Sequence, residues 1–155
     1  MKKLFKQIAR EQYSRIVDSA VGMLDIRQPK EGWIKTVRMA LGMSGPQLAK
    51  RLGSSRSITS YLERSELDGG VTLRKMQNVA EAMGCRFVYA IVPETSIDDL
   101  IEKQALKKAE KLASEASTHM MLEDQALDDG TLEKEKERLK NQIINELNKD
   151  LWSDL

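Results

Sequence analysis

A group of arginine, serine and tyrosine residues lies near position 60 of the sequence and carries the side chains best suited to polar recognition. Its members are Arg56, Ser57, Ser60, Tyr61 and Arg64. An arginine can form two hydrogen bonds with the edge of a guanine, and hydroxyl groups can bond to bases or phosphates. Spacings of three and four residues place most of these side chains on one face of a helix. The pattern predicts contact with DNA. For Arg56 a phosphate contact stays open beside a base contact, and for Tyr61 packing against the preceding helix stays open.

Side chains that can contact the DNA backbone precede this group. The cations are Lys35, Arg38, Lys50 and Arg51, and Gln47 and Ser55 are neutral candidates for contact with DNA. For each cation alone, a solvated surface charge is the alternative interpretation, and Gln47 can instead cap a helix. The complete predicted DNA-binding set is Arg38, Gln47, Lys50, Ser55, Arg56, Ser57, Ser60, Tyr61 and Arg64.

Glycines and small polar residues divide the surrounding segment into four predicted helices. The first runs from Trp33 and is closed by Gly42. The second starts in a capping box, in which a serine and a glutamine three residues later satisfy each other's backbone amides. The third is expected to be capped by Ser54 or Ser55 and to reach about Arg64. The residues of that capping box are Ser44 and Gln47, and the second helix stops at Gly53. The fourth helix is capped by Thr72 and ends at Gly84. Its expected inward residues are Leu73, Met76, Val79, Ala80 and Met83.

The second and third of these helices have the features of a helix-turn-helix. The second has an apolar face with a small residue that permits close helix packing, and a glycine supplies the turn. The third buries one face and leaves its N-terminal part free to enter a major groove. Residues 29–65 hold seven basic and two acidic residues, a net charge of +5 that would attract phosphates. The inward residues are Leu48, Ala49 and Leu52 in the second helix, and Thr59 and Leu62 in the third.

This stretch resembles the Xre-type repressor family over residues 33–84, about a third of the chain. The resemblance lies in Ile34-Lys35-x-x-Arg38, Gln47-Leu48-Ala49-x-x-Leu52-Gly53 and Leu62-Glu63-Arg64. It implies a lambda-repressor-like DNA-binding domain. Gly45 stands where that family often has a glutamine that touches a phosphate, and Ser54 and Thr59 stand where apolar residues are usual. These departures predict a slightly weaker core or a shift of the third helix by one residue.

Four longer runs carry a second resemblance. They are Pro29-x-Glu31-Gly32-Trp33-Ile34, Arg38-x-Ala40-Leu41-Gly42-Met43-Ser44, Gly84-Cys85-Arg86-Phe87-Val88-Tyr89-Ala90-x-Val92-Pro93 and His119-Met120-Met121-Leu122-Glu123-Asp124-Gln125. These runs resemble the family called mobile mystery protein A, which is typically encoded beside a Fic-domain protein. The resemblance implies a regulator or antitoxin paired with a Fic enzyme that modifies proteins with nucleotide groups. The spacing of an inhibitory Fic motif fits Thr131 and Glu135, but Lys136 follows where glycine or asparagine is needed, so inhibition by that motif is not expected.

The whole chain is predicted to be mainly all-α, in four parts. Residues 1–28 form an N-terminal helix, 29–84 the helix-turn-helix domain, 85–93 a strand and 94–155 an acidic helical region. Residues 85–92 are rich in β-branched and aromatic types, and no second strand is evident, so we expect pairing with the same strand of a second subunit. A buried segment without a strand partner, or a short helix, is the alternative. The predicted dimerisation residues are Phe87, Val88, Tyr89 and Ile91.

The C-terminal region favours a protein partner. Residues 93–155 hold nine basic and sixteen acidic residues, a net charge of −7 that would repel DNA. Helices are expected over 96–117 and 132–151, the second with Leu139, Ile143, Leu147 and Leu151 inward. Met120, Met121 and Glu123 are candidate partner-binding residues, with helix packing as the alternative.

Other classes of function find little support. His119 is a lone histidine without further metal ligands, so no metal is expected, and the absence of a phosphate loop or a Cys-His pair argues against an enzyme or a cofactor. One cysteine, Cys85, fits a reducing cytoplasm. No apolar run approaches the roughly 18 residues of a membrane span, so no membrane is expected.

The sequence therefore predicts a cytoplasmic, sequence-specific DNA-binding transcriptional regulator. We expect a homodimeric autorepressor that reads a palindromic operator in double-stranded DNA, and an antitoxin-like partner of a Fic-domain protein. The alternative is a protein-interaction module that acts through its C-terminal helices with weak or no DNA binding.

Overall fold

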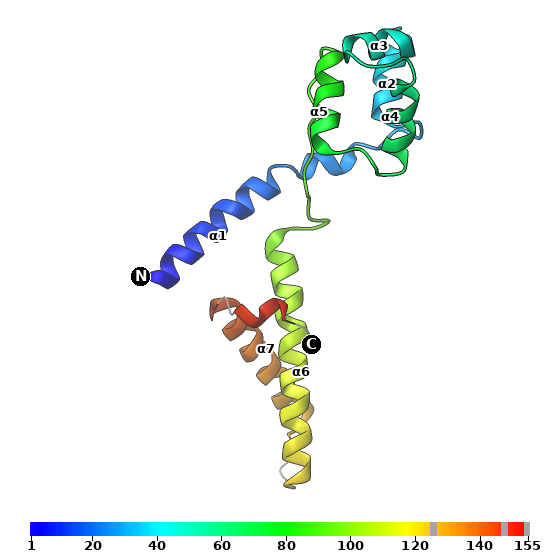
Figure 1. The fold of residues 1–155 in the computed structure, drawn as a ribbon. Coiled ribbons are helices and arrows are strands. Elements are labelled where there is room, and N and C mark those ends of the chain that lie inside the picture. The colour runs from blue at the N-terminus through cyan, green and yellow to red at the C-terminus, as the bar shows by residue number, and fades with distance from the viewer. Residues whose placement is uncertain (125–126, 147–148, 154–155) are drawn as a thin grey trace. The chain divides into compact units, whose positions relative to one another are not determined.

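The computed structural model describes residues 1–124, 127–146 and 149–153, and this part of the chain is mainly helical (Figure 1). The chain divides into two compact units, one formed by residues 1–21 and 91–155 and the other by residues 22–90. The prediction of a mainly all-α protein is confirmed. No helix in the described ranges has the length and apolar character needed to cross a membrane.

The unit of residues 22–90 contains four α-helices around one small core. They are α2 (Trp33–Ala40), α3 (Gly45–Arg51), α4 (Ile58–Leu67) and α5 (Leu73–Ala82), and the 3-10 helix η1 (Val21–Asp25) precedes them. Each fully buried aliphatic side chain contributes about 1.5–3 kcal/mol to folding. The buried core consists of Ile34, Leu48, Leu62, Met76, Val79 and Met83.

The predicted caps of α3 and α5 are confirmed. The Gln47 amide donates to Ser44 Oγ at 3.2 Å, and the Ser44 amide donates to Gln47 Oε1 at 2.7 Å, which completes the capping box of α3. The Lys75 amide donates to Thr72 Oγ1 at 3.1 Å and so starts α5. Each predicted glycine stop has a positive φ, a conformation that favours glycine. These φ angles are 63° at Gly42, 64° at Gly53 and 72° at Gly84.

The boundaries of α4 differ from the prediction. The helix begins at Ile58 with Ser57 as N-cap and ends at Leu67, instead of starting behind Ser54 or Ser55 and ending near Arg64. Ser57 makes no capping hydrogen bond with its side chain, so no local sequence signal marks this start. In α5, Leu73 was expected to face inward and is instead 51% exposed.

The segment after α5 forms no strand within the described residues. A strand requires a hydrogen-bonded neighbour, and the single chain supplies none for residues 85–92. Phe87 packs against the core of residues 22–90, whereas Val88, Tyr89 and Ile91 are 60%, 59% and 93% exposed. Pairing of this segment between subunits stays a prediction.

The other unit contains α1 (Lys2–Asp18), α6 (Ile97–Leu122), α7 (Asp129–Glu146) and the 3-10 helix η2 (Lys149–Trp152). The predicted N-terminal helix thus ends earlier than residue 28, and the helix predicted from Ser96 continues past residue 117. Ser96 caps α6 as expected, since its Oγ accepts the Asp99 amide at 3.0 Å. The helix predicted over residues 132–151 is divided into α7 and η2, and Leu147 lies outside the described residues.

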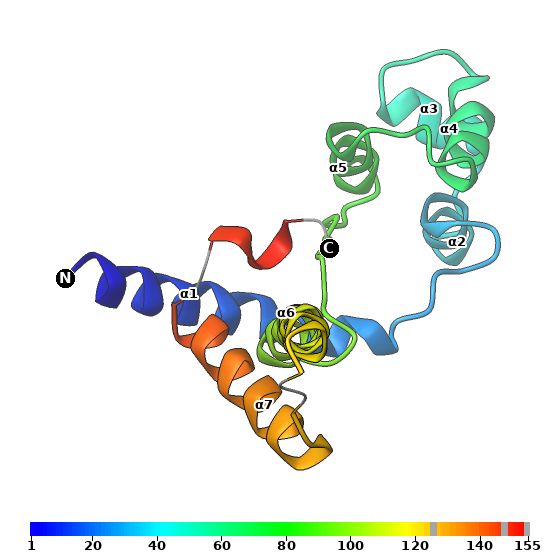
Figure 2. The ribbon, with the colours of Figure 1, turned by 90° about the horizontal axis from the view of Figure 1, so that it is seen from below.

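Small residues bring α6 and α7 together. Ala105 and Ala109 of α6 are fully buried and share a core with Ile143 and Leu151. Figure 2 looks along α6 and shows α7 beside it. Lys140 Nζ of α7 lies 3.1 Å from Glu102 Oε1 of α6, which adds an ion pair across the two helices. The two helices therefore form a hairpin whose seam is lined by alanine.

Candidate nucleic-acid interface

The recognition candidate α4 has one buried and one exposed face. Thr59 and Leu62 are only 2% and 3% exposed, in agreement with their predicted inward direction. The opposite face follows the three- and four-residue spacing of a helix. It consists of Ser57, Ser60, Tyr61 and Arg64, all of them exposed. Within this face, Arg64 Nε bonds loosely to the Ser60 carbonyl at 3.4 Å, and the Tyr61 hydroxyl makes no hydrogen bond in the described chain.

The turn before α4 carries the two remaining candidates of the cluster. Ser55 and Arg56 are exposed and precede the first helical residue, Ile58. The Ser55 and Ser57 hydroxyl oxygens lie 3.2 Å apart, within hydrogen-bond distance. The Arg56 guanidinium has neither a hydrogen bond nor an ion pair within the described residues. Arg56 therefore belongs to a turn beside the N-terminus of α4, and its charge is available to a partner.

The joint between α3 and α4 depends on two residues that depart from the Xre-type pattern. Thr59 Oγ1 donates a 2.7 Å hydrogen bond to the Gly45 carbonyl oxygen. A buried hydroxyl is costly unless it has a partner, and this bond supplies one. Thr59 and Leu62 keep the predicted register, so the possible shift of this helix by one residue does not occur.

A contact that sequence reasoning missed fixes the start of α2 to α4. The Trp33 and Ile34 amides donate to Glu66 Oε1 and Oε2 at 2.7 Å and 3.0 Å. The carboxylate thus satisfies two free amides at the positive end of the helix dipole. Gly32 leaves room for it, because a Cβ there would lie 2.6 Å from Glu66 Oε2. The available signal was a helix start at Gly32, which has no side chain that can cap.

The residues predicted to contact the DNA backbone differ in how free their side chains are to bind a partner. Arg38 Nε lies 2.6 Å from Glu63 Oε1, with the two side chains 12% and 15% exposed, and Arg38 Nη1 donates to the Met43 carbonyl at 2.9 Å. Arg38 is therefore engaged inside the fold. Gln47 is exposed but uses its Oε1 in the capping box, while Lys50 is exposed in the last turn of α3.

The structure also locates the residues predicted for dimerisation and for partner binding. The rings of Phe87 and Tyr89 stack with their centroids 5.7 Å apart. Met120 and Met121 belong to the last turn of α6, where Met121 is 64% exposed, and Glu123 follows as its C-cap. Gln125 lies outside the described residues. The described residues hold no group of three or more His, Cys, Asp or Glu side chains that could bind a metal ion.

Comparison with known proteins finds no family model, no curated sequence and no solved structure that matches this chain.

Proposed function

We propose that the chain is a sequence-specific DNA-binding transcriptional regulator that reads DNA through α4 and the turn before it. One observation carries the proposal. The exposed polar face of α4 and the unpaired Arg56 form one surface, while the opposite face of the helix is held against α3 and α2. A recognition helix needs this division, since its buried side fixes its angle and its free side enters the major groove.

Each residue of this surface has a distinct expected role. Arg56, at the N-terminal side of α4, is placed to bond a base edge, where a good bidentate pair gives about 1–3 kcal/mol of discrimination. Ser57, Ser60 and Tyr61 supply short-range contacts, and Lys50 supplies a phosphate contact. Arg38 is left out of the interface because its guanidinium is already paired with Glu63.

We propose further that the protein acts as a dimeric autorepressor of the Xre type. Two recognition helices about 34 Å apart would read the two halves of a palindromic operator. The exposed residues Val88, Tyr89 and Ile91 are the proposed dimer contact, because exposed apolar side chains that lie close together often mark a protein contact.

The test is binding of the purified protein to the DNA upstream of its own gene, measured by fluorescence anisotropy at fixed salt. Arg56→Ala is expected to weaken specific binding by about 5- to 150-fold, the equivalent of 1–3 kcal/mol. Arg74→Ala removes an exposed arginine from α5 and serves as the charge-matched control. The proposal fails if the wild type binds this DNA no more tightly than unrelated DNA, or if both variants lose the same affinity.

A second role, as an antitoxin-like partner of a Fic-domain protein, has support in the C-terminal helices. Met121 and Leu122 are 64% and 80% exposed at the end of α6, beside the exposed acidic Glu123 and Asp124. An apolar spot with an acidic rim suits a protein partner better than DNA. Co-purification of the chain with a co-expressed Fic-domain protein tests this role. Loss of that complex in Met121→Asp, but not in Arg56→Ala, would support it.

A further inference from the structure

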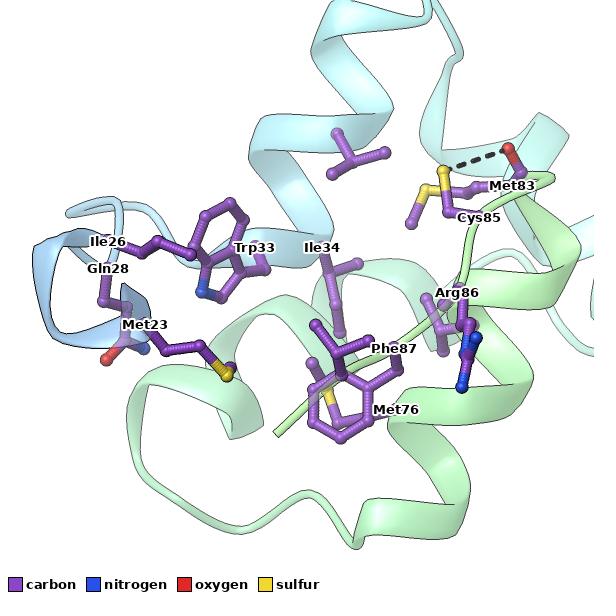
Figure 3. A pocket seen from close by; sticks show the side chains of 14 residues that line it. Met23, Ile26, Gln28, Trp33, Ile34, Met76, Met83, Cys85, Arg86 and Phe87 are labelled. Atoms are coloured by element: carbon purple, nitrogen blue, oxygen red, sulfur yellow. Dashed lines mark hydrogen bonds between the residues drawn. The ribbon is translucent and has the colours of Figure 1, made fainter. Parts of the chain in front are cut away.

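An apolar pocket lies within the unit of residues 22–90 and has no role in the proposed DNA contact. Its volume is about 410 Å³, and it opens between the start of α2, the inner face of α5 and the segment after α5 (Figure 3). Pockets that bind small molecules usually measure about 300–1,000 Å³. The space is therefore of the right size for one small organic molecule.

The lining is mostly apolar and includes two aromatic rings. Trp33 and Phe87 contribute the rings, and Met23 and Met76 contribute flexible sulfur-containing side chains. Trp33 is 40% exposed, an unusual state for a tryptophan beside a core. Methionine and aromatic side chains adapt to flat or branched apolar ligands. The lining thus favours a ligand with an aromatic or branched aliphatic part.

Two polar side chains and one indole N–H of the lining have no hydrogen-bond partner among the described residues. Gln28 and Arg86 flank the pocket on opposite sides in Figure 3, and neither side chain has a hydrogen bond or ion pair within the described part of the chain. The Trp33 indole N–H is likewise unpaired. Cys85 is already used, since its Sγ donates to the Met83 carbonyl at 3.6 Å.

No carboxylate lines this pocket. Glu81 lines an adjoining hollow that shares Arg86, but the two form no ion pair. The pocket therefore offers one positive charge and neutral donors, and no negative charge that would repel an acid. An acidic group is the ligand group that the Arg86 guanidinium recognises.

We propose that this pocket binds a small amphipathic anion, with an apolar body between Trp33 and Phe87 and one acidic group beside Arg86. The proposal does not depend on DNA binding, because the site is complete without DNA.

Two fluorescent dyes test this proposal on the full-length protein. The anionic probe is 8-anilinonaphthalene-1-sulfonate, and the uncharged probe is N-phenyl-1-naphthylamine, which has a similar aromatic body. Both are expected to bind with one site per chain. In Trp152→Phe, which leaves Trp33 as the only tryptophan, either dye should quench the tryptophan emission by energy transfer.

Two variants separate the charge from the apolar body. Arg86→Gln is expected to weaken binding of the sulfonate dye by about 2- to 5-fold, the effect of one exposed ion pair. The affinity for the uncharged dye should not change. Arg74→Gln, which removes an exposed arginine outside the pocket, should change neither. Ala80→Leu fills part of the pocket and should weaken both dyes, with circular dichroism used to verify the fold.

Several results would overturn the proposal. One is that neither dye quenches Trp33, and another is that Ala80→Leu binds both dyes as well as the wild type. If Arg86→Gln and Arg74→Gln weaken binding of the sulfonate dye equally, Arg86 does not bind the acidic group of the ligand. If light scattering shows a dimer and the dyes are lost as the dimer forms, the occupant is a second copy of the chain instead of a small molecule.

Discussion

Thr59 and Gly45 join the two helices of the proposed helix-turn-helix through one 2.7 Å hydrogen bond, from the threonine hydroxyl to the glycine carbonyl oxygen. Both positions depart from the Xre-type pattern, but the acceptor is a main-chain carbonyl that any residue at position 45 would supply. A Cβ at Gly45 would lie 3.7 Å from the Thr59 Cβ and Cγ2 atoms, an ordinary contact distance. The hydroxyl, more than the small size of glycine, is therefore the specific feature of this joint.

Thr59→Val should lower the free energy of unfolding by about 1 kcal/mol, because it keeps the shape of the side chain and removes the hydrogen bond. Urea unfolding followed by Trp33 fluorescence, in the Trp152→Phe background, measures the effect. The exposed neighbour in Ser60→Ala is the control and should change stability by less than about 0.5 kcal/mol. A Thr59→Val protein as stable as the parent would show that the bond contributes nothing.

Gly32→Ala should destabilise the same unit by roughly 1–3 kcal/mol. Gly32 has a φ of 82°, which is strained for any residue with a Cβ, and the new methyl carbon would meet the Glu66 carboxylate that caps α2. Gly22→Ala is the matched control, since its φ is not positive and no atom lies within 4 Å of the new carbon. Thermal unfolding of both variants checks the expectation, which would be contradicted by equal melting temperatures.

Arg38→Met should cost roughly 2–3 kcal/mol of stability, because Glu63 is left without its ion-pair partner at a position only 15% exposed. Glu63→Leu in addition should recover part of the loss, and a double-mutant cycle measures the coupling. Lys35→Met breaks an exposed pair with Glu31 and should cost under about 1 kcal/mol. If Arg38→Met keeps full stability and loses DNA affinity, Arg38 is a DNA contact after all.

The start of α7 should lose stability in acid through Asp128. Hydrogen bonds from the Thr131 side chain and backbone lower the pKa of this carboxyl, so its contribution is present above the unfolded pKa and is lost as pH falls through the lowered folded pKa. Asp128→Asn keeps a capping acceptor without the charge. Chemical unfolding followed by circular dichroism should show Asp128→Asn less stable than the wild type at pH 6, with the difference shrinking toward pH 3. Glu115→Gln, at an exposed carboxylate of α6 that forms no hydrogen bond, is the control, and a difference that is constant with pH would contradict the assignment.

Ile91→Asp should convert a dimer into a monomer. Ile91 is 93% exposed, and a charge there would have to be desolvated if a second copy covered it. Leu67→Asp places the same charge at another exposed apolar residue, 54% exposed at the end of α4, and should leave the mass unchanged. Light scattering after size exclusion gives the mass directly. A wild type that is monomeric at all concentrations would exclude the dimer.

Features that depend on residues close in sequence were predicted correctly. The capping box of Ser44 and Gln47 and the caps Thr72 and Ser96 each need a partner only three residues away. Periodic apolar residues such as Leu48 and Leu62 also identified the core faces. Such patterns are visible because helical geometry is regular along the chain.

Features that depend on distant residues were missed. The cap of α2 by Glu66 spans 33 residues and the Arg38–Glu63 pair spans 25. A charged residue on a basic surface looks the same in sequence whether it faces solvent or an acidic partner, so Arg38 was assigned to DNA. The start of α4 was misplaced because Ser54, Ser55 and Ser57 are all serines, and the actual N-cap, Ser57, makes no capping hydrogen bond with its side chain.

The cap of α2 by Glu66 also has a consequence for how the unit folds. Glu66 and Glu63 both belong to α4, and their partners Trp33, Ile34 and Arg38 belong to α2. These contacts cannot form until residues 25 to 33 positions apart in the sequence have come together, which costs loop-closure entropy. We therefore expect α2, α3 and α4 to form in one cooperative step, with a transition state in which these residues have already met.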